Sequence, residues 1–153
     1  MEELTLNDQT VLFDREATIS AYKAIENSWA DTCPCATCRN FLHFRQEAYS
    51  PALLALLARL GIDPMKEWEV FSVGVEVDNL LQYGGWFPFV GEWALEKDKI
   101  DVLNLPKFSI VRPDEFFFTQ IFPNARKAFG NKVLAVEFKA QTPKARDYVS
   151  DWV

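Results

Sequence analysis

The chain has 153 residues, of which 49% are hydrophobic and 25% are charged, and its formal net charge is −6. These values are close to those of globular domains, and an acidic chain with scattered basic residues is expected to bind neither DNA nor RNA, because phosphate contacts supply most of that affinity. No apolar run reaches the roughly 18 residues that a membrane-spanning helix needs, and the acidic N-terminus lacks the basic and apolar regions of a secretory signal.

The first elements along the chain are predicted to be N-terminal strands, over about residues 10–29. Residues 10–14 give one strand and residues 16–29 a second, because apolar residues recur at even spacings in a segment rich in β-branched side chains. Asp14 and Arg15, which separate the two segments, would form the tight turn of a hairpin.

A helical part is predicted over about residues 38–67, and its clearest helix spans residues 51–60. Ser50 is a favourable N-cap, Pro51 stands at the first helical position, and Gly61 is placed for the left-handed residue that ends a helix. Leucines recur at the spacing of one helical face, which predicts a buried stripe. The stripe consists of Leu53, Leu56, Leu57 and Leu60, with Leu54 widening it.

The C-terminal strands are predicted over about residues 69–140, where the apolar period changes to two. In the first of them, one apolar face is expected to point inward: Phe71, Val73, Val75 and Val77. Further strands are predicted at residues 80–95, 107–112, 114–121 and 132–140. Gly84 and Gly85 interrupt the second strand, which indicates a bulge or a bend.

This order of elements indicates an α+β fold, with one mostly antiparallel, twisted sheet and a helical pair packed on one face. Strand and helix do not alternate, which argues against a doubly wound α/β fold. Residues 1–153 are expected to form a single globular domain.

The three cysteines, Cys33, Cys35 and Cys38, lie within six residues of one another. Their odd number and tight spacing argue against a disulfide framework and favour a reducing cytoplasm. The Cys35–Cys38 pair matches half of a zinc site. No cofactor is expected from the sequence, and zinc is the one that these residues would allow. His43, the single histidine, would complete a Cys₃His site, but it stands about 140° around a helix from Cys38. Asp31 is an alternative fourth ligand.

Two other interpretations of the cysteines stay open. One thiol could act as a nucleophile or in redox chemistry. In that case Thr37 would cap the following helix and Cys38, in its first turn, would be the most reactive thiol. Alternatively, the cysteines are small apolar side chains that fill space in a tight loop, which is the most frequent role of such residues.

An aromatic-rich stretch follows later, and it has two interpretations. It is either a buried central strand, which is favoured, or a ligand cleft or partner surface that would also allow self-association. Its members are Tyr83, Trp86, Phe87, Phe89 and Trp93. Pro88 cannot donate to a strand ladder, which predicts an edge or a break there. No phosphate-binding loop, nucleophile elbow or zinc-protease motif is present, so no catalytic residue is assigned.

Three segments together resemble a group of short uncharacterised bacterial proteins. They are "CPCATCRNF", a Leu-rich helix closing in "LGIDP", and "GGWFPFVG", and the similarity covers about residues 32–91. The C-x-C-x-x-C-x-N-F piece is its most specific part. The resemblance implies a bacterial, cytoplasmic setting and brings no activity with it.

The leading functional hypothesis is a non-enzymatic binding or interaction module for a small molecule or a protein, which would use the aromatic-rich stretch. The alternative is a thiol- or zinc-dependent enzyme, or a metal-binding protein, that uses Cys33, Cys35 and Cys38. Neither a nucleic-acid nor a membrane partner is expected, and a homo-oligomer is compatible with the sequence.

Overall fold

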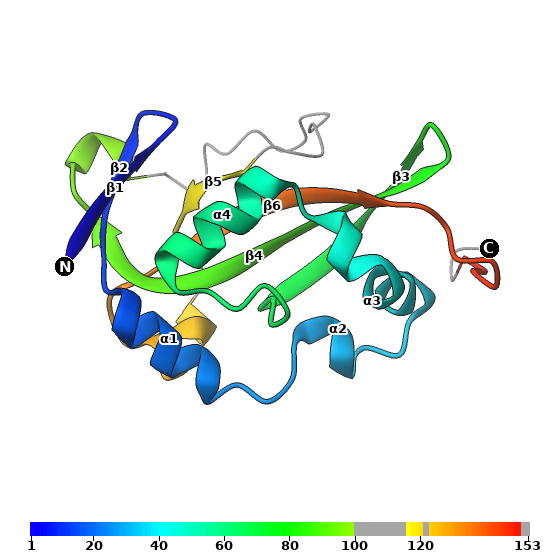
Figure 1. Cartoon of the computed structure of the whole chain (residues 1–153), viewed down its shortest axis with the longest axis horizontal. Coiled ribbons are helices and arrows are strands. Elements are labelled where there is room, and N and C mark those ends of the chain that lie inside the picture. Colours follow the sequence, from blue (N-terminus) through cyan, green and yellow to red (C-terminus); the bar gives the residue numbers. More distant parts are fainter. Residues whose placement is uncertain (100–115, 121–122, 151–153) are drawn as a thin grey trace.

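The computed structural model describes residues 1–99, 116–120 and 123–150 (Figure 1). Its strands are β1 (Glu2–Leu6), β2 (Gln9–Phe13), β3 (Glu69–Val77), β4 (Leu80–Trp93), β5 (Phe116–Thr119) and β6 (Val133–Thr142). Its α-helices are α1 (Arg15–Lys23), α2 (Trp29–Thr32), α3 (Ala36–Ala48), α4 (Pro51–Leu60) and α5 (Arg126–Phe129), with short 3₁₀ turns at Glu96–Asp98 and Pro123–Ala125. The strand predicted at residues 107–112 lies outside the described residues.

Within the described part of the chain, the sheet has six strands, of which five follow the order β1-β2-β4-β6-β5 while β3 pairs separately with β4. Every pairing is antiparallel. The long strand β4 pairs with a different strand on each part of one edge: its first half pairs with β3 and its last residues pair with β2. On its other edge, residues 81–90 pair with β6. The predicted α+β fold with an antiparallel sheet is therefore confirmed.

Helix α4 lies in front of β4 and β6 in Figure 1, and α3 lies at the lower right, next to β3; together they cover one face of the sheet. Aromatic rings fill the interface: Tyr49, at the end of α3, packs edge-on against Phe87 and Phe138 at centroid distances of 5.7 and 5.3 Å. Phe41 of α3 packs against Tyr83 at 5.2 Å. The predicted helical pair is therefore present, and it encloses the core between itself and the sheet.

Helix α4 begins and ends where its sequence predicts. The Ser50 hydroxyl accepts a hydrogen bond from the backbone N–H of Leu53 at 3.1 Å, and Gly61 has a φ of 83°. A β-carbon at Gly61 would lie 2.8 Å from the carbonyl oxygen of Arg15, so the neighbouring chain also requires glycine here. Leu54 does not widen the buried stripe, because its side chain is 37% exposed.

The prediction of a strand at residues 16–29 is wrong, because this segment forms most of α1 and the connection that leads to α2. The Asp14 carboxylate caps α1 by accepting from the N–H of Ala17 at 3.0 Å. The buried side chains of α1 are Thr18 and Tyr22, four residues apart, so the true period is helical. The Tyr22 hydroxyl donates to the carbonyl of Pro88 at 2.7 Å and ties α1 to β4.

The N-terminal hairpin forms earlier in the chain than predicted. Strands β1 and β2 meet at Asn7 and Asp8, whose φ angles are 49° and 66°. Positive φ at both central residues suits the tight turns that match the twist of a two-stranded ribbon. Asp14 and Arg15, the predicted turn, instead start α1.

Strand β3 does not bury the predicted valine face. Its buried apolar residue is Val70, whereas Val75 is 57% exposed and Val73 and Val77 are also exposed. The register with β4 shifts between Ser72 and Glu76, so the regular alternation is lost there. The end of the β3–β4 hairpin projects beyond the helices in Figure 1.

None of the described helices is both long and apolar enough to cross a membrane.

Candidate metal centre

The three cysteines lie at the corner between α2 and α3. Helix α2 starts with a reciprocal cap, in which the Ser28 hydroxyl accepts from the N–H of Asp31 at 3.2 Å and the Asp31 carboxylate accepts from the N–H of Ser28 at 2.9 Å. The helix ends at Cys33, whose N–H donates to the carbonyl of Ala30. Helix α3 then begins one residue after Cys35.

The corner brings the sulfur atoms together. The Sγ atoms of Cys33, Cys35 and Cys38 all lie within 4.8 Å of one another. The Cys33 thiol donates to the Sγ of Cys35 at 3.1 Å. Cys33 and Cys35 are half-buried, whereas Cys38 is only 5% exposed, so the cluster has an exposed side and a buried side. The three thiols, which lie within six residues of one another in the sequence, are therefore also close in space.

Cys35, and not Thr37, caps α3. Its Sγ accepts from the backbone N–H of Cys38 at 3.4 Å and lies 3.3 Å from the Thr37 hydroxyl. Burial opposes ionisation, but hydrogen bonds from Thr37, Cys33 and Cys38 lower the pKa of Cys35 to about 7. Burial and the two neighbouring thiols raise the pKa of Cys38 far above its usual value. The capping geometry and these pKa shifts favour Cys35, and not the predicted Cys38, as the most reactive thiol.

In the metal-free, reduced protein we expect Cys35 to be alkylated fastest and Cys38 slowest. Because the thiolate is the nucleophile, the rate at Cys35 should fall as the pH drops through its pKa of about 7. Brief treatment with iodoacetamide over a pH series, followed by fragmentation of the peptide that carries all three cysteines, would measure each rate. Faster labelling of Cys38 than of Cys35 would contradict the capping arrangement.

Neither fourth ligand suggested by the sequence joins the thiols. His43 is exposed on α3, and its ring stacks edge-on against Phe44 at 4.7 Å. The Asp31 carboxylate is occupied by Ser28 and by Arg45, whose guanidinium lies 3.6 Å away. Among the described residues, the group that could hold a metal ion at this corner consists of the three cysteines.

The sulfur positions fit a tetrahedral metal ion. Zinc–sulfur bonds of about 2.3 Å place neighbouring sulfurs about 3.8 Å apart. The cluster, with all its sulfurs within 4.8 Å and the Cys33 and Cys35 sulfurs 3.1 Å apart, needs shifts of only about 1 Å to reach that spacing. Three thiolates would leave one coordination position, which an outside ligand can take.

Two polar anchors, a tyrosine hydroxyl and an asparagine amide, hold the start of α3 on the sheet. The Tyr83 hydroxyl of β4 donates to the carbonyl of Thr37 at 2.8 Å, in the first turn of α3. One turn further on, the buried Asn40 amide donates to the Thr142 hydroxyl at 2.8 Å and accepts from the N–H of Ala145 at 2.7 Å. The start of α3, and with it the thiol corner, is therefore fixed against β4 and the chain that follows β6.

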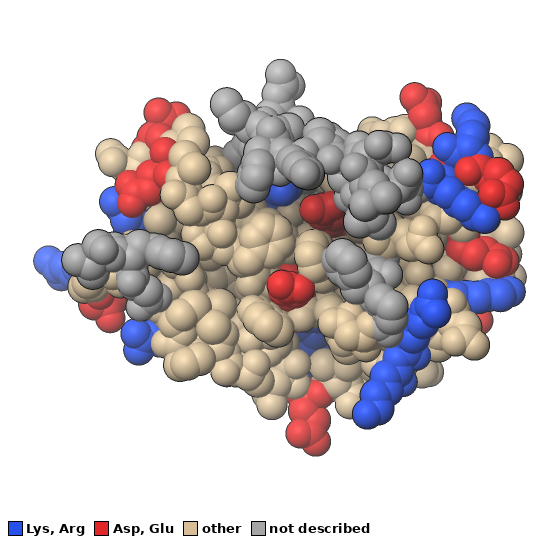
Figure 2. Space-filling model, turned by 180° about the vertical axis from the view of Figure 1, so that it is seen from behind, with Lys and Arg blue, Asp and Glu red and all other residues tan. Residues whose placement is uncertain are grey.

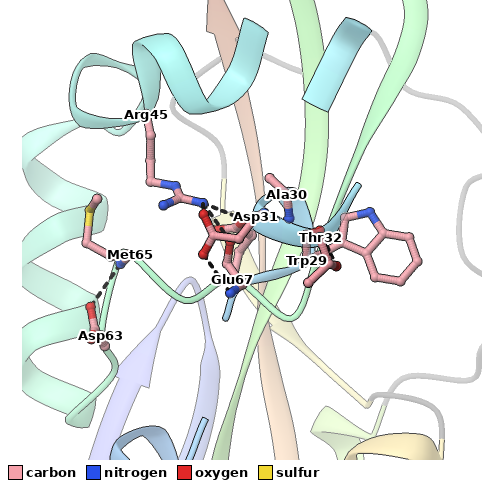
Figure 3. A network of polar contacts seen from close by, with 9 residues as sticks. Trp29, Ala30, Asp31, Thr32, Arg45, Asp63, Met65 and Glu67 are labelled. Carbon is pink, nitrogen blue, oxygen red and sulfur yellow. Dashed lines mark hydrogen bonds and ion pairs between the residues drawn. The ribbon is translucent and has the colours of Figure 1, made fainter. Parts of the chain in front are cut away.

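A buried ion pair, which the sequence does not predict, fixes the other side of the corner (Figure 3). The Arg45 guanidinium of α3 lies 3.1 Å from the Glu67 carboxylate and donates to the Ser28 hydroxyl at 2.6 Å. The same carboxylate oxygen accepts from the N–H of Ala30 at 3.2 Å. Burial raises the pKa of Glu67, and the attraction of Arg45 opposes this. No sequence pattern signals a pair whose partners are 22 residues apart.

The aromatic stretch divides into fully buried and half-exposed side chains. Tyr83, Phe87 and Phe89 are buried, so they are not part of a ligand or partner surface. Trp86 and Trp93 are half-exposed. Figure 2 shows the side of the molecule away from α3 and α4, where uncharged atoms predominate around a few acidic groups. The favoured interpretation, a buried strand, therefore holds for three of these side chains.

No family model, curated protein or solved structure matches this chain. The geometry and chemistry of the thiol corner therefore carry the functional argument.

Proposed function

We propose that the chain is a metal-binding protein that holds one zinc ion through the thiolates of Cys33, Cys35 and Cys38. The observation that carries the proposal is the convergence of the three sulfurs to within 4.8 Å on a corner that other contacts hold in place. Thiolates are soft ligands that favour zinc over magnesium or calcium. The low pKa of Cys35, about 7, supports binding at neutral pH, because metal ligation requires the deprotonated sulfur.

The fourth coordination position is proposed to take water or a donor from a partner molecule. Structural zinc sites use four protein ligands, whereas sites with three keep a position for an exchangeable ligand. We assign the site to binding and not to hydrolysis, because the Asp31 carboxylate, a possible base two residues before Cys33 in the sequence, is held in a helix cap and an ion pair. A reducing compartment such as the bacterial cytoplasm would keep the thiols available.

The leading hypothesis from the sequence, an interaction module built on the aromatic stretch, has less support than the metal site. Three of its proposed surface residues lie in the core, which leaves Trp86 and Trp93 half-exposed. The two tryptophans lie on different stretches of β4, seven positions apart in the sequence. They do not form a set of converging groups comparable to the thiols.

Zinc titration of the reduced, metal-free protein tests the proposal. We expect one equivalent of zinc to bind with submicromolar affinity against a chromophoric chelator, and all three thiols to become protected from a thiol reagent. Cys35→Ser and Cys38→Ser should each weaken binding by at least about 10-fold, since even outer-shell changes cost that much.

His43→Ala is the matched control, because His43 is outside the thiol group and should leave the zinc affinity unchanged. A loss with His43→Ala as large as that with Cys38→Ser would favour the Cys₃His site and count against the geometry. Absence of any binding at micromolar zinc would overturn the proposal.

A further inference from the structure

The exposed side of the thiol cluster contains two sulfurs in direct contact. Cys33 and Cys35 are both half-buried, and their Sγ atoms are 3.1 Å apart. Cys33 ends α2 and Cys35 precedes α3, and both have extended backbone angles, with φ of −93° and −70°. In an extended segment, alternate side chains share a face and their Cα atoms lie about 6.4–6.8 Å apart, which is within the range of disulfides.

Cys38 differs from this pair in its position. It is buried in the first turn of α3, with 5% of its surface exposed, and it lies on the inner side of the cluster. An oxidant that arrives from solvent therefore meets Cys33 and Cys35 first. Of these two, Cys35 has the sulfur on which hydrogen-bond donors converge, from the Cys33 thiol and from the N–H of Cys38.

We infer that Cys33 and Cys35 form a site of reversible oxidation, in which a peroxide converts the two thiols to a disulfide and Cys38 is left reduced. The inference goes beyond zinc binding and does not require it. Its consequence for a zinc-loaded protein would be loss of the ion, because two of the three thiolate ligands would be consumed.

The chemistry balances with a peroxide as the oxidant. The Cys35 thiolate attacks one peroxide oxygen, so that a sulfur–oxygen bond forms, the oxygen–oxygen bond breaks and, for hydrogen peroxide, hydroxide leaves. The Cys33 sulfur then attacks the sulfur of the resulting sulfenic acid. A sulfur–sulfur bond forms, the sulfur–oxygen bond breaks, and the hydroxyl leaves as water with the thiol proton. Two electrons pass in total from the sulfurs to the peroxide, and a dithiol reductant reverses the change.

The test uses the reduced, metal-free protein with one equivalent of hydrogen peroxide. Intact mass after blocking with N-ethylmaleimide should show the loss of two hydrogen atoms and one maleimide adduct in place of three. Cys38→Ser should form the disulfide as fast as the natural chain. Cys33→Ser should form one at least about 10-fold more slowly, because its remaining partner is the buried thiol.

The opposite ranking would overturn the inference: a disulfide that forms in Cys33→Ser but not in Cys38→Ser would identify Cys35 and Cys38 as the pair. Three maleimide adducts after oxidation would also overturn it. The zinc titration separates this result from the proposed function. If the chain forms the disulfide but binds no zinc, the inference is supported and the zinc proposal is refuted. If the chain binds zinc but its thiols stay reduced in peroxide, the zinc proposal is supported and the inference is refuted.

Discussion

Arg45→Met is expected to lower the free energy of unfolding by about 3–5 kcal/mol at neutral pH, the cost of breaking a buried ion pair from one side. Methionine keeps much of the side-chain volume, so the loss reports mainly on charge. The substitution removes the guanidinium that lies 3.1 Å from the Glu67 carboxylate and leaves this buried carboxylate with neutral donors such as the N–H of Ala30. Urea unfolding followed by circular dichroism would measure the change.

The loss should depend on pH in a definite direction. Burial raises the pKa of Glu67 and Arg45 opposes the rise, so removing Arg45 should raise this pKa further. A carboxyl with a raised pKa in the folded chain costs stability when it is ionised. This destabilisation is absent at pH values below the pKa of a glutamate in the unfolded chain, about 4.3, and reaches its full size at pH values above the pKa of Glu67 in the folded chain. Arg45→Met should therefore be less destabilised at about pH 5 than at neutral pH.

Two further variants serve as controls for the ion pair. Arg59→Met breaks an exposed pair with Glu2, at 3.0 Å, and should cost about 1 kcal/mol or less. Arg45→Met combined with Glu67→Gln removes both charges and keeps an acceptor for Ala30, so it should be more stable than Arg45→Met alone. Equal losses for Arg45→Met and Arg59→Met would show that the burial of the pair has no energetic consequence.

Leu57→Ala is expected to lower the free energy of unfolding by about 2–5 kcal/mol, the usual cost of deleting a buried leucine side chain. Leu57 is fully buried on the face of α4 that covers the sheet. The loss combines the transfer of apolar surface with the cavity that the neighbouring side chains cannot close. Chemical denaturation at neutral pH gives the value directly.

Leu54→Ala is the matched control on the same helix. Leu54 is 37% exposed, so the same substitution should cost about 1 kcal/mol or less. The helix propensity change is identical at both positions, and the difference between the two variants isolates burial. A loss below about half a kcal/mol for Leu57→Ala would mean that this face of α4 does not belong to the core.

The parts of the fold that could be predicted from the sequence are those with local signals. Helix α4 has its cap, its proline, its terminal glycine and its leucine stripe within a dozen consecutive residues, and all but the place of Leu54 is confirmed. Helix α1 could not be predicted from the sequence, because the half-buried apolar residues Ile19 and Ala21 have the two-residue spacing of a strand. The side chains of α1 that are buried, Thr18 and Tyr22, are less apolar.

At the candidate site, too, only the features with a local sequence signal could be predicted. The three cysteines are close in space because they are close in sequence. The side chain that caps α3 depends on the residue at which the helix starts. Threonine is a much commoner N-cap than cysteine, so the sequence favours Thr37 over Cys35. The contacts that hold the corner join Arg45 to Glu67 and Tyr83 to Thr37 across the fold, and no local pattern encodes such pairs.

The pairing of β4 with β6 also constrains the order in which the chain folds during synthesis. Residues 81–90 pair with residues 133–142, so the central ladder cannot close until the later strand has left the ribosome. Helices α1 to α4 and the two hairpins are local and can form sooner, since short loops close at small entropic cost. Before β6 is synthesised, the helices can pack against only part of the sheet. The aromatic side chains of β4 are then accessible to chaperones. A strand from the middle of the sheet is thus synthesised after the helices and strands that it joins, and a chain truncated before β6 would lack the partner along most of β4.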